Sequence, residues 1–162
     1  ARLQDCVFGV TADPVVLPVA QALVVEMGGD PVVIKEADRV TYHAALSHGS
    51  NHLVTVTAQA RQLLAEIGVP DTDRVLRPLM WASLENALTD GDGALTGPVA
   101  RGDVETLRGH REMLRELVAG GMPRDVLDVW EVLARATAER AVRRGALRAD
   151  VGQRILAVLA DD

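Results

Sequence analysis

Three polar residues with helical spacing are the first candidates for chemistry in this sequence. His43, Ser47 and Asn51 follow one another at intervals of four residues, so on an α-helix they share one face, each step turning only about 40° around the axis. This face offers an imidazole, a hydroxyl and an amide, the groups needed to protonate and orient a carbonyl. Gly49 costs about 1 kcal/mol relative to alanine inside a helix, which suggests close approach by another backbone or by a ligand. The alternative is that His43 and Asn51 are buried, hydrogen-bonded core residues and that Gly49 marks a helix crossing.

A second candidate site is the glycine-rich segment from Leu95 to Asp103. Thr96, Gly97 and Arg101, together with exposed amides at the start of a helix, could hold an anion such as a carboxylate. The alternative is a turn between helices that carries a surface arginine. Asp103 is better explained as the N-cap of the following helix than as an acid catalyst.

Other residues capable of chemistry are less informative. His48 and His52 have the spacing of a zinc-binding pair, but no third ligand is placed nearby, so no metal site is expected. Cys6 is the only cysteine, and because it lies in an apolar run we expect a small buried residue. Trp81 and Trp130 stand among Leu, Val and Met at helical spacing and are expected in the core. The chain has no Gly-x-Gly-x-x-Gly, P-loop or Gly-x-Ser-x-Gly motif.

The composition narrows the possible classes of protein. The 162 residues are 48% hydrophobic and 25% charged, with a net charge of −6, which argues against nucleic acid or an anionic membrane as the main partner. One cysteine excludes a disulfide framework, and no membrane span or signal peptide is visible. These features favour a soluble cytoplasmic protein. Because the chain begins with Ala1, we expect it to be processed or cut from something longer.

The first part of the chain predicts one strand–helix–strand unit, which must position whatever follows. The helix is expected to start at Asp13–Pro14 and to end at Gly28, which suits a left-handed cap. A unit this small cannot cover both faces of a parallel sheet, so it reads as the remnant of a larger α/β domain. Its predicted segments are a strand at 6–11, a helix at 15–27 and a strand at 31–34.

From Asp38 onward the pattern is helical throughout. A helix capped by Asp38 is expected to run to about Ile67, a length of roughly 45 Å, and to form a spine with other helices packed around it. Pro78 either kinks the second helix or marks its true start. A glycine-rich stretch follows over residues 89–102, in which Gly97, Pro98 and Gly102 are expected to form a tight loop. The remaining predicted helices are 74–88, 103–119, 125–144 and 150–160. The fold class is therefore mainly α, with a helical domain built on a long spine after a small α/β remnant.

Three motifs together resemble the DUF2520 family, whose members pair a Rossmann-like nucleotide-binding domain with a helical C-terminal domain. The resemblance implies that residues 1–37 are the end of the nucleotide domain and that residues 38–162 are the helical, dehydrogenase-like DUF2520-type domain. The matching residues are Tyr42-His43-Ala44-Ala45 with Asn51, Leu84-Glu85-Asn86, and Leu95-Thr96-Gly97-Pro98-Val99-Ala100-Arg101-Gly102-Asp103.

The family is similar in layout to ketopantoate reductases, pyrroline-5-carboxylate reductases and hydroxyisobutyrate-type dehydrogenases. That similarity implies an oxidoreductase using NADP or NAD, bound mainly by the preceding domain, so this chain alone is not expected to be active. It also implies a homodimer, formed mainly through the helical domain, and a small carboxylate-bearing carbonyl or imine substrate. His43 would be the general acid, with Asn51 and Ser47 orienting the reacting group. The carboxylate would be held by Thr96, Gly97, Arg101 and Asn86.

One departure from the related enzymes leaves a second hypothesis open. Ketopantoate reductases and hydroxyisobutyrate-type enzymes carry a catalytic lysine on the corresponding helix, whereas Lys35 is the only lysine in this chain. The alternative is a non-catalytic dimerisation or ligand-sensing protein that retains the dehydrogenase fold.

Overall fold

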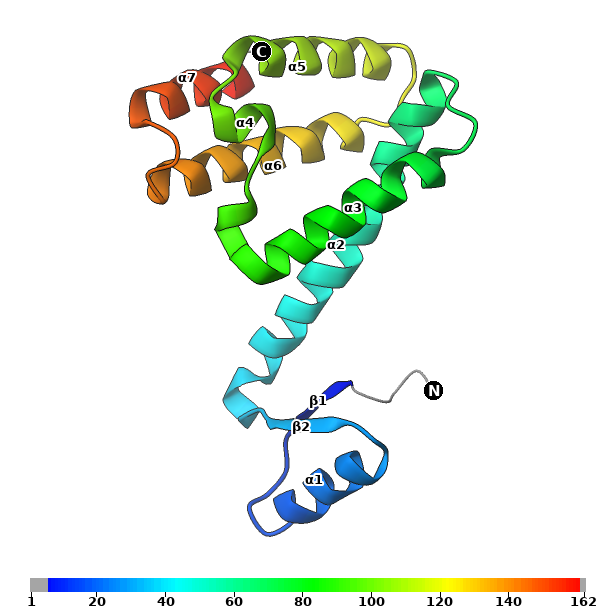
Figure 1. Cartoon of the computed structure of the whole chain (residues 1–162), viewed down its shortest axis with the longest axis vertical. Coiled ribbons are helices and arrows are strands. Elements are labelled where there is room, and N and C mark those ends of the chain that lie inside the picture. The colour runs from blue at the N-terminus through cyan, green and yellow to red at the C-terminus, as the bar shows by residue number, and fades with distance from the viewer. Residues whose placement is uncertain (1–5, 161–162) are drawn as a thin grey trace. The chain divides into compact units, whose positions relative to one another are not determined.

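The computed structural model describes residues 6–160, and the chain divides into two compact units, residues 1–55 and 56–162. The mainly helical fold class is confirmed, since one two-stranded sheet accompanies a succession of helices (Figure 1). The predicted domain boundary at residues 37 and 38 stays a prediction, and residues 1–5 and 161–162 of those domains lie outside the described residues. None of the helices within residues 6–160 combines the length and hydropathy of a transmembrane segment.

The first unit contains the predicted strand–helix–strand arrangement. Strand β1 (Val7–Val10) pairs in parallel with β2 (Asp30–Val33), and α1 (Leu17–Glu26) connects them. Gly28 ends α1 with a φ of +82°, so the predicted left-handed cap is confirmed.

The start of α1 differs from the sequence-based prediction. The backbone N–H groups of Val16 and Leu17 both donate to the carbonyl oxygen of Asp13, which makes residues 14–16 a turn that precedes the helix. Pro18, rather than Pro14, is the proline of the first helical turn. Both positions suit proline because the first N–H groups of a helix have no partner within it.

This unit leaves much of its apolar surface uncovered. Val10 and Val24 are buried, but Val7, Val32 and Val33 are 45–60% exposed. Parallel strands are normally covered on both faces. The unit therefore does not bury its own sheet, as expected for part of a larger α/β structure.

The predicted long helix is present as α2 (Arg39–Glu66), which follows a short 3-10 helix, η1 (Glu36–Asp38). Its packing differs from a spine surrounded by other helices, since Gln59 is its only buried residue within the described part of the chain. The Gln59 amide donates to the backbone oxygen of Asp125 at 3.1 Å and to its Oδ2 at 2.7 Å. These bonds and the packing of Leu63 against the core are contacts within the second unit, to which the C-terminal part of α2 belongs.

The core of the second unit lies mainly among its last three helices. Several of the core residues are alanine, and this allows close approach of helix backbones. The core residues include Leu107, Ala134, Ala138, Ala141, Ile155 and Leu159. The elements of the second unit are α3 (Thr72–Asp90), η2 (Gly91–Ala94), α4 (Gly97–Arg101), α5 (Val104–Ala119), α6 (Asp125–Arg143) and α7 (Ala149–Ala160).

Two expectations about α3 and the segment after it need correction. The predicted tight loop at Gly97 to Gly102 contains the short helix α4, and η2 precedes it. Of the two alternatives for Pro78, the start of the helix is excluded, because α3 begins at Thr72, where Asp71 caps it by accepting from the Arg74 N–H. Trp81 is 71% exposed rather than in the core, since α3 buries only Leu76. Trp130, by contrast, packs against both core clusters, as predicted.

Candidate functional site

A hollow of about 500 Å³ opens in the first unit at the carboxyl ends of β1 and β2. Thr11 follows β1 and donates its hydroxyl to the backbone oxygen of Ile34, which follows β2, at 2.6 Å. Ligands of α/β folds bind outside the carboxyl ends of parallel strands, so this is the position where a ligand is expected. The lining residues are Gly9, Thr11, Ile34, Glu36, Arg39, Val40, Tyr42 and His43.

The contact between Tyr42 and Gly9 holds the start of α2 against the strand. A Cβ atom at Gly9 would lie 2.7 Å from Tyr42 Cε1 and 2.9 Å from Cζ. Carbon atoms that are not bonded to each other do not approach this closely. The Tyr42 ring therefore occupies space that only glycine leaves free. Because His43 is the next residue, this contact also places the imidazole at the mouth of the hollow.

We predict that Gly9→Ala weakens the contact between β1 and the start of α2. The added methyl group must displace the Tyr42 ring, and such overpacking costs typically about 1–3 kcal/mol. Native-state hydrogen exchange of the β1 amides measures the effect locally, without assuming that the two units unfold together.

The matched control is Gly49→Ala, since a Cβ at Gly49 meets nothing within 4 Å. This variant should stabilise α2 by about 0.5–1 kcal/mol through helix propensity. In a Tyr42→Ala background, Gly9→Ala should no longer destabilise β1, because the ring that the methyl group would displace is absent. If Gly9→Ala destabilised β1 equally in both backgrounds, the effect would not arise from the contact with Tyr42.

His43 lies at the hollow, whereas its two helical neighbours lie beyond it. His43 is exposed and has no hydrogen-bond partner within residues 6–160. Ser47 and Asn51 continue the same face of α2 but do not line the hollow. Asn51 stands about 12 Å from His43 along the helix axis at 1.5 Å per residue, so the two residues cannot both contact one small group.

The interpretation of these residues as buried core is wrong. His43 and Asn51 are both exposed. Within residues 6–160, the Asn51 side-chain oxygen accepts a hydrogen bond only from the hydroxyl of the neighbouring Ser50, at 3.3 Å. Gly49 also does not mark a close approach within the described chain, since the space beside it is open.

Arg39 adds a positive charge to the hollow that the sequence-based prediction missed. Its guanidinium contacts the carboxylate of Glu36 at 3.4 Å, and both side chains are mostly exposed. Exposed ion pairs of this kind contribute little to stability, about 0–1 kcal/mol. The Arg39 guanidinium can therefore leave Glu36 and bind an anionic ligand. The sequence did contain a signal for Arg39, because this residue lies four residues before His43 and therefore on the same helix face.

The second predicted site is built around α4. Gly97 begins this helix with a φ of +87°, and Gly102 ends it with a φ of +73°. A Cβ at Gly102 would lie 2.6 Å from Val151 Cγ1, so glycine is required there both by conformation and by packing against α7. Thr96 and Arg101 are exposed at the two ends of α4.

Asp103 is the N-cap of α5, as predicted. Its carboxylate accepts from the Thr106 N–H at 3.1 Å and from the Thr106 hydroxyl at 2.7 Å. The side-chain hydrogen bond first, the backbone bond next and more weakly the charge of Arg101 lower the pKa of Asp103 below its usual value. Since this carboxylate already occupies the start of α5, a bound anion must use Arg101 and Thr96 instead of the α5 amides.

The predicted site residues fall into different units. His43, Ser47 and Asn51 belong to residues 1–55, whereas Thr96, Gly97, Arg101 and Asn86 belong to residues 56–162. Asn86 is exposed on α3. A common cleft between His43 and Arg101 stays a prediction.

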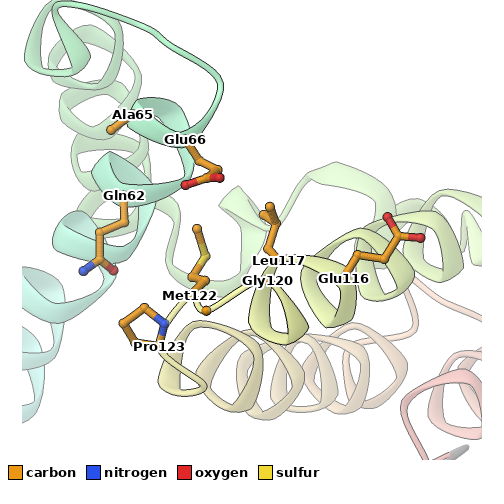
Figure 2. A pocket seen from close by; sticks show the side chains of 9 residues that line it. Gln62, Ala65, Glu66, Glu116, Leu117, Gly120, Met122 and Pro123 are labelled. Carbon is orange, nitrogen blue, oxygen red and sulfur yellow. The ribbon is translucent and has the colours of Figure 1, made fainter.

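Another hollow, of about 510 Å³, lies in the second unit and does not contain the predicted residues. Figure 2 shows Glu66, Leu117 and Met122 around it, with Glu116 on the other side of Leu117 from Glu66. Its carboxylates make it unsuitable for an anionic substrate. Its lining residues are Gln62, Ala65, Glu66, Glu116, Leu117, Gly120, Gly121, Met122 and Pro123.

Metal-ligating side chains do not gather into a larger site in the described residues. His48 and His52 approach each other with their Nδ1 atoms 2.8 Å apart on α2. Within residues 6–160, no group of three or more His, Cys, Asp or Glu side chains is positioned to hold a metal ion.

The parallel strand–helix–strand unit and the helical unit that follows define a mainly α protein with a hollow at the strand ends, lined by both polar and apolar side chains. The chain belongs to the family described as "Domain of unknown function (DUF2520)", which matches residues 6–137. The resemblance seen in the sequence motifs is thereby confirmed.

A solved structure shares this fold. The crystal structure of protein TM1727 from Thermotoga maritima is 23% identical to this chain, with a TM-score of 0.71. The match covers 85% of this chain and 54% of TM1727, so the chain spans about half the length of that protein. No protein with curated function matches this chain in sequence.

Proposed function

We propose that this chain is part of a longer NAD(P)-dependent oxidoreductase that reduces a small carboxylate-bearing carbonyl or imine. The observation that carries the proposal is the hollow at the carboxyl ends of β1 and β2, with the His43 imidazole at its mouth and no hydrogen-bond partner for it among residues 6–160. A volume of about 500 Å³ suits a small substrate, since ligand pockets commonly measure about 300–1,000 Å³.

In this proposal His43 is the general acid. The nicotinamide, when bound, supplies the hydride that reaches the carbonyl or imine carbon. His43 donates its proton to the oxygen or nitrogen of the same bond, which yields an alcohol or an amine. Ser47 orients the reacting group, and Asn51, one further turn away, contacts a more distant part of the bound molecules.

The substrate carboxylate is assigned to the second unit. Arg101 provides the charge, and Thr96, Gly97 and Asn86 provide further contacts. A guanidinium can bind a carboxylate through two parallel hydrogen bonds, which fixes both position and orientation. Arg39, beside His43, offers a second cationic contact for an anionic group.

The nucleotide itself is proposed to bind mainly outside this chain. The sequence has no glycine-rich phosphate loop, and the first unit leaves its parallel sheet partly uncovered. The protein TM1727, which shares this fold, is about twice as long as the part of it that matches this chain. We also propose a cytoplasmic homodimer that associates mainly through the helical unit.

Titration with NADPH and NADH tests this proposal. A longer protein that includes the preceding domain should bind one of the two nucleotides saturably, whereas the 162-residue chain alone should not. Isothermal titration calorimetry of both proteins provides the measurement. Tight binding by the 162 residues alone would show that the nucleotide site has been assigned to the wrong part of the protein.

One observation favours a second candidate function, a non-catalytic dimerisation or ligand-sensing protein. The helix that carries His43 contains no lysine, unlike the corresponding helix of the best-known related enzymes. The two functions differ in a simple assay of the longer protein. Oxidation of NADPH in the presence of small 2-oxo acids or cyclic imino acids supports the enzyme, and nucleotide binding without turnover of any of these supports the sensor.

A further inference from the structure

Two histidine side chains converge on an exposed face of α2. His48 and His52 lie one helical turn apart, and their Nδ1 atoms are 2.8 Å from each other. The two rings meet edge to face, with their centroids 4.7 Å apart and their planes at 88°. Both side chains are exposed, so the protein core does not fix either ring and both are open to a ligand.

The distance between these nitrogen atoms is close to that between two neighbouring ligands of one metal ion. At metal–nitrogen distances of about 2.0–2.1 Å, two ligands at a right angle lie about 2.9 Å apart, and two at the tetrahedral angle lie about 3.4 Å apart. Right-angle positions are typical of Cu²⁺ and Ni²⁺, for which imidazole is a suitable ligand. The observed 2.8 Å therefore fits a tetragonal ion better than tetrahedral zinc.

We propose that His48 and His52 chelate a divalent transition-metal ion of the Ni²⁺ or Cu²⁺ type through their Nδ1 atoms. Without the metal, one Nδ1 carries a proton and donates it to the other. When the ion binds, that proton moves through water to Nε2 of the same ring, and both Nδ1 lone pairs turn toward the ion. Water fills the other coordination positions, since within residues 6–160 no third His, Cys, Asp or Glu joins the pair.

The spacing of the two histidines did not by itself predict this site. A closed structural zinc site takes four protein ligands, and the sequence places no third ligand near the pair. An open chelate needs only two ligand atoms at the right distance. A separation of four residues permits that distance but does not guarantee it, and the folded helix supplies it.

The metal site is separate from the proposed active site. At 100° per residue, His48 lies about 140° and His52 about 180° around α2 from His43, and neither lines the hollow at the strand ends. The sequence of α2 between Arg39 and Arg61 contains no Lys or Arg. No fixed positive charge on this part of the helix therefore opposes a bound cation.

The turn that the two histidines span has little support of its own, which indicates what a bound ion does. Gly49 lies within the turn and is a poor helix former. The Ser50 hydroxyl donates to the backbone oxygen of Leu46 at 2.7 Å, a contact that slightly destabilises helices. The one buried residue of α2 within the described chain, Gln59, lies further along. An ion held by residues four positions apart keeps the turn closed and stabilises it.

Calorimetric titration of the untagged chain with nickel chloride tests the site. One ion should bind per chain. His48→Ala and His52→Ala should each raise the dissociation constant by about 100-fold, because the second contact of a chelate is intramolecular. His43→Ala removes a lone exposed histidine of the same helix and should leave the dissociation constant unchanged. Magnesium chloride should give no binding, because Mg²⁺ prefers oxygen ligands.

A second control separates the spacing of the histidines from their number. The double variant His52→Val/Val54→His keeps the composition but sets the two imidazoles six residues apart, about 120° around the helix. It should bind Ni²⁺ as weakly as His52→Ala, and circular dichroism confirms that it is folded. At a free Ni²⁺ concentration about 100 times the dissociation constant, amide exchange of residues 49–56 should slow about 100-fold in the wild type alone.

Three results would overturn the proposal. The first is a wild-type chain that does not bind Ni²⁺ saturably. The second is equal loss of affinity in His48→Ala and His43→Ala, and the third is a double variant that binds as tightly as the wild type. Binding without slower exchange in residues 49–56 would overturn the stabilising role of the ion. None of these outcomes depends on nucleotide binding.

Discussion

An Arg111→Met variant should unfold with a free energy about 3 kcal/mol lower than that of the wild-type chain. The Arg111 side chain is 9% exposed and pairs with Glu131 at 2.6 Å, joining α5 to α6. It also reaches the backbone oxygen of Leu159 at 3.5 Å, at the end of α7. Methionine keeps most of the apolar stem but leaves the half-buried Glu131 carboxylate without its cation, and that unpaired charge is the main cost.

Urea denaturation measures this effect, and the chain offers a close control. Arg108 lies on the same helix, three residues earlier, and its contact with Glu105 at 3.6 Å is exposed. Arg108→Met should therefore change stability by less than about 1 kcal/mol. Adding Glu131→Leu to Arg111→Met should recover much of the loss, because the unpaired carboxylate is removed. Equal effects of Arg108→Met and Arg111→Met would rule out a structural role for the buried pair.

The second large effect concerns catalysis. The proposed function predicts that, in a longer protein that includes the preceding domain, His43→Ala lowers kcat by about 10²–10⁴-fold, the usual contribution of a general acid. The proposed role of His43 toward the substrate also predicts that the dissociation constant of the nucleotide changes little. Steady-state oxidation of NADPH and calorimetric titration of the nucleotide measure the two quantities separately.

Comparison with two further variants distinguishes the roles of the site residues. Arg101→Ala should mainly raise the substrate KM, as expected for loss of a contact made before and during the reaction. His52→Ala changes an exposed histidine on the same helix and should leave both constants unaltered. If His43→Ala and His52→Ala lower kcat equally, His43 is not the acid.

Features with local causes were predictable from the sequence. Asp103 caps α5 because its carboxylate reaches the N–H of a residue only three positions away. Gly28 ends α1 because few other residues adopt its backbone conformation at low cost. The bounds of α2, α5, α6 and α7 follow within about two residues from such signals, which is the usual uncertainty of helix ends.

Trp81 shows where this reasoning fails. Apolar residues at helical spacing predict that a helix has an apolar face, but they do not say what covers it. Trp81 and Trp130 have similar neighbours in sequence, yet Trp130 packs between two core clusters and Trp81 is exposed on α3.

The candidate site was predictable in part for the same reason. The shared face of His43, Ser47 and Asn51 depends only on helical periodicity, which the sequence carries. The role of Tyr42 was missed because it depends on a strand some thirty residues earlier, whereas Arg39 was missed although it lies four residues before His43 on the same helix face. Only when β1 lies beside α2 does Gly9 admit the Tyr42 ring and the hollow form.

The order and type of the main elements, the capped helix ends and the shared face of His43, Ser47 and Asn51 were predictable from the sequence. These depend on hydrogen bonds and steric limits between residues a few positions apart. Three outcomes became visible in the folded chain alone: the core lies among α5, α6 and α7 rather than around α2, His43 reaches the hollow whereas Ser47 and Asn51 do not, and Trp81 is exposed. Those outcomes depend on contacts between residues distant in the chain, which the spacing of residues within one helix does not specify.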